Sequence, residues 1–265
     1  MTSAPAHPPS RIAPNLDHAF DGVWRLTWRR YLLPSRWISV VVGLAVLALL
    51  CLGSGGRFDQ PANYTEFVIR LYVTFLVPAT AFMAAAGAMR DEMKSATVDY
   101  VLTRPLPRPA FVLFKFAAQG ACVQLDLLLA FAVVLGVGWI RGAAGLTAAV
   151  PQLLLAQVLL GVAFTAFGFL CGVITGRFVV IGLFYGGLVE AGVGQIPTQL
   201  NRLSMTHQVR ELLLPLAERT ASTASAASLG AWFLATAIVL TFTAIMLGAA
   251  AAIFTLRELS GRAEP

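Results

Sequence analysis

The sequence predicts an all-α, polytopic membrane protein with six transmembrane helices, and three observations lead to this fold class. Of 265 residues, 58% are hydrophobic and only 12% are charged, about half of the roughly 25% usual in soluble domains. The mean hydropathy is +0.76. The apolar residues form long stretches between charged residues, and the chain has room for six helices of about 20 residues each. An ordinary soluble globule is therefore excluded.

Uncharged stretches bounded by basic residues define the first four predicted spans. They cover residues 37–56, 71–89, 113–140 and 151–175. Each is long enough to cross the hydrocarbon layer as a helix that rises 1.5 Å per residue. Residues 116–140 of the third span contain one charged residue, Asp126, and the fourth span opens at Pro151, a residue suited to a first helical turn.

Two further spans, 178–193 and 229–256, complete the predicted set. The fifth is the weakest of the six because Glu190 interrupts it. Between them lies an outer segment, 194–228, which is long for a simple connection. We expect this segment to be a re-entrant or gating element.

The distribution of basic residues predicts that both termini are cytoplasmic. With the N-terminus inside, 13 Lys and Arg residues lie in cytoplasmic segments and six in outer segments, as the positive-inside rule requires. Losing one crossing would place the C-terminal arginines outside. The excess of basic residues, which gives a net charge of +6, is therefore interpreted as the signal that orients the chain in the membrane. We expect no nucleic-acid partner.

The N-terminal region is predicted to contain a tail and a surface helix. Residues 1–15 are rich in Ala, Pro and Ser and are expected to be a disordered tail, followed by a single six-span domain over 16–265. Within 16–33, apolar residues recur at helical spacing opposite a charged face. This pattern predicts an amphipathic helix lying along the membrane surface, serving either as an anchor or in gating.

Glycines at four-residue spacing predict places where two helices approach closely. Gly168, Gly172 and Gly176 form one such series, and Gly182 with Gly186 forms another. Small residues at this spacing let helix backbones come together in a membrane. The contact is either packing within the chain or a dimer face.

The sequence carries no recognisable catalytic constellation. It has no zinc-protease, nucleophile-elbow or phosphate-loop motif, and its three cysteines match no metal-binding spacing. We therefore expect a protein that is not an enzyme, with no metal and no cofactor in this chain.

Two carboxylates stand out within the predicted spans. An ionised carboxylate near the bilayer midplane costs at least about 2.5 kcal/mol, so Asp126 and Glu190 should face protein or water. Both are candidates for translocation or gating. Alternatively, Asp126 is a hydrogen-bonding partner for a helix such as the fourth span, and Glu190 shapes the end of the fifth.

The predicted cytoplasmic loop 90–112 is the most informative segment. It continues the charged end of span two into a short apolar helix carrying Tyr100, then into a Pro-limited turn. Asp91, Glu92, Arg104 and Arg108 surround this apolar bump. Such a knob suits insertion into a groove on a protein partner, although a solvated loop with extended arginines is the alternative.

At these residues the chain resembles the membrane subunit of type-2 ATP-binding-cassette exporters. The matching pattern is an acidic end to span two, Thr97 a few residues later, an Arg-Pro-Leu-Pro-Arg turn at 104–108 and a lysine opening span three. A second stretch is similar to the family's fifth span and outer gating helices. It comprises Leu188-Val189-Glu190, Ile196-Pro197, Leu203-Ser204 and His207.

The resemblance implies that two copies of the chain pair and that each docks on a separate ATPase through the 90–112 loop. The docking positions would be Asp91, Glu92, Thr97, Tyr100, Arg104, Pro105 and Arg108. The partner ATPase would bind ATP and magnesium and hydrolyse the ATP. Translocation or gating would involve Asp126, Glu190 and His207.

We therefore expect a multi-pass permease subunit in a bacterial inner membrane, in contact with lipid, that exports a substrate which the sequence does not identify. Two alternatives stay open. One is an ion- or proton-coupled carrier that uses Asp126 and Glu190. The other is a nonenzymatic membrane anchor for soluble partners.

Overall fold

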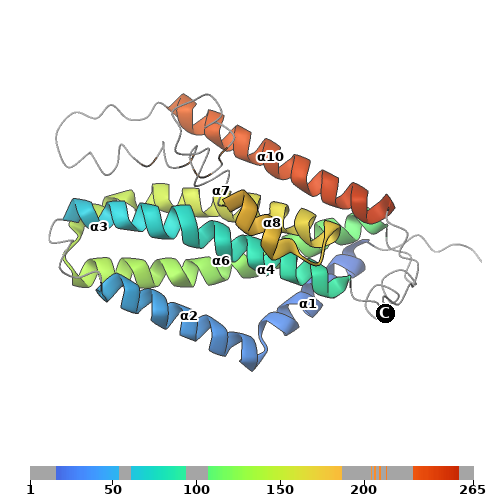
Figure 1. Cartoon of the computed structure of the whole chain (residues 1–265), viewed down its shortest axis with the longest axis horizontal. Helices are drawn as coiled ribbons and strands as arrows, with labels where there is room; N and C mark the ends of the chain where they lie inside the picture. The colour runs from blue at the N-terminus through green and yellow to red at the C-terminus, as the bar shows by residue number, and fades with distance from the viewer. Residues whose placement is uncertain are drawn as a thin grey trace, which may run out of the picture.

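The computed structural model describes residues 16–53, 61–93, 107–186 and 229–256, together with Ser204, Thr206, Val209 and Leu213. Every regular element within these residues is a helix (Figure 1), which confirms the all-α class. The bounds are α1 Leu16–Tyr31, α2 Pro34–Gly53, α3 Pro61–Val68, the π-helix η1 Ile69–Leu76, α4 Val77–Glu92, α6 Arg108–Ile140, α7 Ala144–Ile174, α8 Phe178–Phe184 and α10 Leu229–Leu256.

Five helical stretches in the described residues are long and apolar enough to cross a membrane, so the chain is a multi-pass membrane protein. They are Pro34–Gly53, Tyr64–Glu92, Arg108–Ile140, Ala149–Ile174 and Trp232–Leu256. Each overlaps one of the predicted spans. The remaining prediction, 178–193, coincides with α8, which has seven residues, and residues from 187 onward lie outside the described part. A sixth span, like the cytoplasmic location of the termini, therefore stays a prediction.

The helices that contain predicted spans two and three extend beyond these spans, because a charged residue limits a membrane crossing without ending a helix. Predicted span two begins at 71, whereas α3, η1 and α4 form one helical run from Pro61 to Glu92. Arg70 lies inside this run and pairs with Glu66 one turn earlier at 2.6 Å. Similarly, the 33 residues of α6 extend about 50 Å, well beyond a hydrocarbon layer of about 30 Å.

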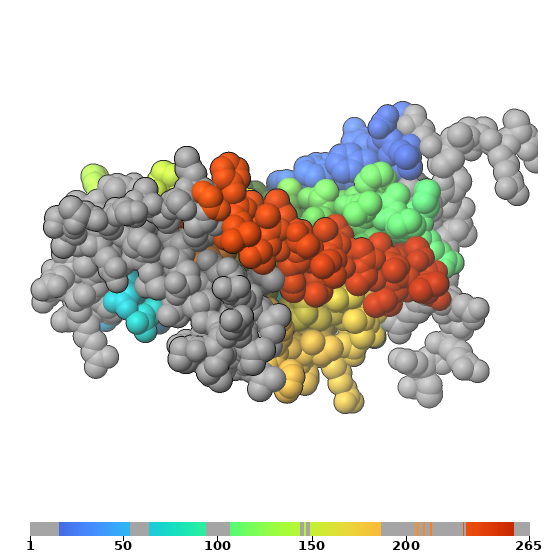
Figure 2. Space-filling model, turned by 90° about the horizontal axis from the view of Figure 1, so that it is seen from above, coloured from blue at the N-terminus to red at the C-terminus, as the bar shows by residue number. Residues whose placement is uncertain are grey.

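The helices are arranged around α4, α6 and α7 (Figure 1). In this view α10 runs along one side of the group, and α1 and α2 form a V on the other side. Figure 2 shows α10 running across one face, between the green start of α6 and the yellow region of α7 and α8. Among the residues of α2, only Leu47 and Cys51 are buried. Helices α2 and α10 therefore present apolar surface outward from a single copy of the chain.

Helices α4 and α7 are in close contact because glycines of α7 face the backbone of α4. A Cβ atom at Gly168 would lie 2.6 Å from the carbonyl oxygen of Phe82, and one at Gly172 would lie 2.7 Å from that of Ala86. The packing interpretation of this glycine series is therefore confirmed for these two positions. Their contact is within the chain.

A buried tyrosine links the middle of the helix group. The hydroxyl of Tyr72, in η1, lies 2.7 Å from the carbonyl oxygen of Leu127 in α6 and 2.6 Å from Oε1 of Gln157 in α7. A buried hydroxyl is stabilised when it finds such acceptors. This contact connects η1, α6 and α7 inside an otherwise apolar core.

Helix α1 is amphipathic, as the pattern over 16–33 predicts, and it ends at Tyr31. Consecutive ring contacts join Phe20, Trp24, Trp28 and Tyr31, and Phe20 also meets Phe114 of α6 edge-on with ring centroids 5.3 Å apart. Part of the aromatic face thus packs on α6. The location of α1 along the membrane surface stays a prediction.

Candidate functional site

A buried carboxylate joins three helices at the end of the molecule where α4 ends and α6 begins. Glu92 is the last residue of α4 and is only 3% exposed. Its Oε1 accepts hydrogen bonds from Nζ of Lys115 in α6 at 2.9 Å and from Nη1 of Arg30 in α1 at 2.7 Å. Lys115 also donates to the hydroxyl of Thr27 in α1 at 3.2 Å. We call Arg30, Glu92 and Lys115 the charged corner.

The charged corner is stabilised by the pairing of its opposite charges. A carboxylate at the C-terminus of a helix is unfavourable next to the negative end of the helix dipole, and two cations offset this. Removing one partner from a buried ion pair leaves an unpaired buried charge, which is strongly destabilising. Glu92 and Lys115 therefore hold the end of α4 to the start of α6, and Arg30 holds α1 to both.

A second charged group lies farther along α6. Asp126 accepts hydrogen bonds from the Tyr31 hydroxyl at 2.7 Å and from Nη2 of Arg36 at 3.3 Å. Burial, together with this hydrogen bond, raises the pKa of Tyr31 above its usual range, so the hydroxyl stays protonated and donates. The Arg36 guanidinium also lies 5.1 Å from the Tyr31 ring centroid.

The partners of Asp126 differ from those expected from the sequence. They come from the junction of α1 and α2, not from the fourth predicted span.

The start of α6 also holds the end of α10. Nη1 of Arg108 donates to the carbonyl oxygen of Thr255 at 3.1 Å, and the rings of Phe111 and Phe254 stack with centroids 5.8 Å apart. A cation near the last carbonyl groups of a helix is favourable for the helix dipole. The residues on either side of the 90–112 loop are thus anchored to α1 and α10.

The predicted docking residues that the structure describes differ in their exposure to solvent. Asp91 is exposed, whereas Glu92 is buried in the charged corner and Arg108 is partly buried against α10. Glu92 therefore does not form part of an exposed polar rim. Thr97, Tyr100, Arg104 and Pro105 lie outside the described residues, as do Glu190 and His207.

Sequence reasoning missed the residues that complete these clusters, namely Arg30, Lys115, Tyr31 and Arg36. One signal was available for Lys115, because it is one of only two lysines in the chain and begins an apolar run. Its partner could not be read from the sequence. In the part of the chain that the structure describes, no group of three or more His, Cys, Asp or Glu residues could hold a metal ion.

The sequence of this chain is similar to those of known transport proteins. A family model described as "ABC-2 family transporter protein" matches residues 28–186, more than half of the chain. The chain is 29% identical over 223 residues to the "Probable ABC transporter permease protein NosY" of Stutzerimonas stutzeri, a match that covers 81% of this chain and 65% of that protein. It is 31% identical over 137 residues to the protein of the same name from Pseudomonas aeruginosa, covering 49% and 46%. The chain thus spans less than two thirds of the length of these relatives.

Proposed function

This chain belongs to the ABC-2 family of transporter proteins as a membrane permease subunit, and we propose that a separate ATP-binding subunit drives it as an exporter. In this proposal the partner binds ATP and magnesium and hydrolyses the ATP. The permease contributes the membrane path and the surface on which the partner docks.

The observation that carries this proposal is the charged corner at the base of the 90–112 loop. Helix α4 enters the loop at Glu92, and α6 leaves it at Arg108. Because Lys115 and Arg30 share Glu92, the two ends of the loop and α1 are joined. A movement imposed on the loop by a soluble partner would therefore reach α4 and α6 together through the buried Glu92–Lys115 pair, and it would reach α1 through the half-exposed Arg30.

The proposed docking surface has an exposed part and a supporting part. The exposed part consists of Asp91 with Thr97, Tyr100, Arg104 and Pro105, which would contact the ATP-binding subunit directly. Glu92 and Arg108 support the loop from inside the permease through their contacts with Lys115, Arg30 and Thr255. This division assigns different roles to residues that are adjacent in the sequence.

We further propose that two copies of the chain pair in a bacterial inner membrane, with six spans and cytoplasmic termini. The outward surfaces of α2 and α10 support this proposal. Large apolar side chains there are well exposed in the single chain, among them Val41, Leu49, Phe233 and Ile245. An apolar surface of this extent suits lipid and a second permease subunit.

A copurification experiment tests the docking proposal. The tagged permease is isolated from its native membranes with the ATP-binding subunit, and the double variant Arg104→Glu/Tyr100→Ala is compared with Arg70→Glu. Arg70 is exposed and pairs with Glu66 far from the loop, which makes it a matched charge reversal. We expect the double variant to lose at least about 90% of the bound partner, because a tenfold loss corresponds to about 1.4 kcal/mol. Full retention of the partner by the double variant contradicts the proposal.

A further inference from the structure

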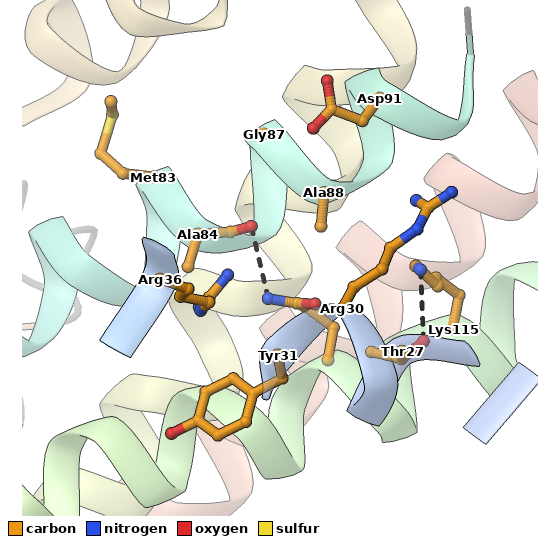
Figure 3. Close-up of a pocket in the computed structure, with 11 residues that line it drawn as sticks. Thr27, Arg30, Tyr31, Arg36, Met83, Ala84, Gly87, Ala88, Asp91 and Lys115 are labelled. Atoms are coloured by element: carbon orange, nitrogen blue, oxygen red, sulfur yellow. Dashed lines mark hydrogen bonds between the residues drawn. The ribbon is translucent and has the colours of Figure 1, made fainter. Parts of the chain in front are cut away.

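A cavity between α1, α4 and α6 lies next to the charged corner (Figure 3). Its volume is about 280 Å³, which equals that of about nine water molecules at about 30 Å³ each. On the α4 side its wall includes the small residues Ala84, Gly87 and Ala88, and a Cβ atom at Gly87 would meet nothing within 4 Å. The cavity therefore has room for a ligand larger than a single ion, because α4 carries short side chains there.

The charged side chains in the wall of the cavity are mostly cationic. Arg30, Arg36 and Lys115 contribute to the wall, together with one carboxylate, Asp91. Asp91 has an interaction partner of its own within the protein. The two carboxylates that pair with the three cations in the clusters described above are not part of the wall. A ligand inside the cavity therefore meets more positive than negative charge.

The three cations retain hydrogen-bond donors that the protein does not use. Nζ of Lys115 has three N–H donors and makes two contacts, with Glu92 and with Thr27. Among the described residues, the guanidinium groups of Arg30 and Arg36 each make one hydrogen bond, although each group has five N–H donors. The Arg36 contact is 3.3 Å long, which exceeds the usual range of about 2.7–3.2 Å. The cavity therefore suits a ligand that is rich in acceptor oxygens.

A phosphate group matches this arrangement better than a carboxylate does. The two oxygens of a carboxylate can both be occupied by one guanidinium in a bidentate pair. A phosphate monoester offers three terminal oxygens, so it can accept from cations in different directions. The cations of the cavity come from α1, α2 and α6, and Figure 3 shows Arg36 on one side with Arg30 and Lys115 on the other. A tetrahedral oxyanion between them can therefore contact more than one helix at once.

We propose that the cavity binds the phosphate group of a phosphate ester through Arg30, Arg36 and Lys115. A phospholipid headgroup and a soluble phosphate ester share this chemistry, and the experiment below distinguishes these two sources. The bound phosphate would join α1, α2 and α6 beside the charged corner. The site does not involve the ATP-binding partner, so it is tested on the purified permease alone, and its failure leaves the proposed function unaffected.

Two pairs of probes, in which the members differ only by the phosphate group, measure binding to the full chain in detergent. Dioleoyl phosphatidic acid is compared with dioleoylglycerol by native mass spectrometry, and glycerol 3-phosphate is compared with glycerol by titration calorimetry. In at least one pair we expect one phosphate-bearing molecule per chain, bound at least about tenfold more tightly than its phosphate-free counterpart, since a charge-assisted hydrogen bond contributes this factor. Tighter binding of phosphatidic acid assigns the site to a lipid headgroup, and tighter binding of glycerol 3-phosphate assigns it to a soluble ester.

Two glycine variants test the location of the site. Gly87→Leu fills the cavity without a clash at Cβ and should abolish binding of the phosphate-bearing probe. Gly120→Leu is the matched control, because Gly120 lies on α6 outside the cavity wall and its Cβ also meets nothing within 4 Å. Equal thermal midpoints of the two variants show that both fold.

Two arginine variants test the chemistry and do not depend on filling the cavity. Arg36→Gln should weaken the phosphate-bearing probe about tenfold. Arg25→Gln is the matched control and should leave binding unchanged, because Arg25 lies outside the wall in an exposed pair with Asp21. The proposal is overturned if neither phosphate-bearing probe binds, or if both members of each pair bind equally. It is also overturned if folded Gly87→Leu or Arg36→Gln binds the probe as tightly as its control variant does.

Discussion

Helix α4 is held in two different ways on its two sides. Towards α7 it packs backbone against backbone, because Gly168 and Gly172 leave no room for a side chain. Towards α1 and α6 it is held at its end by the charged corner, where Glu92 pairs with Lys115 and Arg30. The contact with α7 depends on the complementary shapes of two helices over several turns. The contact with α1 and α6 depends on a few charged side chains at the end of α4.

The difference indicates which contact can change during transport. Close packing of helices tolerates little displacement, because interiors are as dense as organic crystals. An ion pair that includes the half-exposed Arg30 can be remade with another partner or with water. We therefore expect α4 and α7 to move as one body, and α1 to be the element that rearranges when a partner acts on the loop. Four predictions test this comparison.

The largest expected effect is that of Glu92→Gln. The change leaves Lys115, whose side chain is 4% exposed, without its anionic partner, and it should lower the free energy of unfolding by about 3–5 kcal/mol. The thermal midpoint in detergent, followed by size-exclusion chromatography, measures this. Glu66→Gln is the matched control in an exposed pair with Arg70 and should cost less than about 1 kcal/mol.

A double replacement separates the contribution of the buried pair to stability from its role in coupling ATP hydrolysis to the permease. Glu92→Leu with Lys115→Met should restore most of the stability, because apolar residues can replace a buried pair without loss. The same double variant should fail to couple the partner's ATP hydrolysis to the permease. Equal midpoints for the Glu92→Gln and Glu66→Gln variants would show that burial of the corner has no energetic role.

The second effect concerns the packed side of α4. Gly172→Ala places a Cβ atom 2.7 Å from the carbonyl oxygen of Ala86 and should lower stability by about 1–3 kcal/mol. Gly43→Ala in α2 is the matched control, since its Cβ meets nothing within 4 Å. There alanine should be neutral or slightly stabilising, by up to about 1 kcal/mol, because it favours the helix. The two midpoints should therefore shift in opposite directions, and a common shift contradicts the packing argument.

The third effect is smaller and distinguishes the exporter from a proton-coupled carrier. Asp126→Asn removes an ion pair whose side chains are 23% and 36% exposed, so the loss of stability should be about 1 kcal/mol or less. Asparagine can still accept the hydrogen bond from Tyr31. In vesicles containing a pH-sensitive dye, neither form should conduct protons. Proton flux in the unchanged protein that disappears in the variant would favour the carrier.

The smallest effect on stability is expected for Arg30→Gln. Lys115 still neutralises Glu92, and Arg30 is 46% exposed, so the midpoint should change by less than about 1 kcal/mol. Hydrogen exchange should nevertheless become several-fold faster in α1 and stay unchanged in α7. Arg25→Gln, which removes an exposed pair with Asp21 within α1, should leave both rates unchanged. Faster exchange in α7 would contradict the view that α1 moves separately.

The parts of the fold that depend on local composition were predictable. Five predicted spans correspond to membrane-length helices, and the family that the sequence resembles is confirmed by the comparisons. Helix ends were less predictable. The sequence predicts that span two is bounded by Arg70. The helix nevertheless continues past this residue, because the Arg70 side chain pairs with Glu66 on the helix surface.

The contacts at the end of span two could not be predicted from the sequence. The sequence pattern places Glu92 in an exposed polar rim, because a charged residue beside a loop is usually solvated. The structure instead buries it, since cations 23 and 62 residues away along the chain reach it. Asp126 is paired in the same way with a residue 90 positions away.

The sequence by itself determined that this chain crosses a membrane as helices and where two of them can approach. The physical reason is that a segment in hydrocarbon must satisfy its own backbone hydrogen bonds, so apolar length alone specifies a helix. Only the tertiary structure decided which charges neutralise one another and which become buried. Those outcomes depend on distances of about 3 Å between side chains on different helices, which no local pattern of residues encodes.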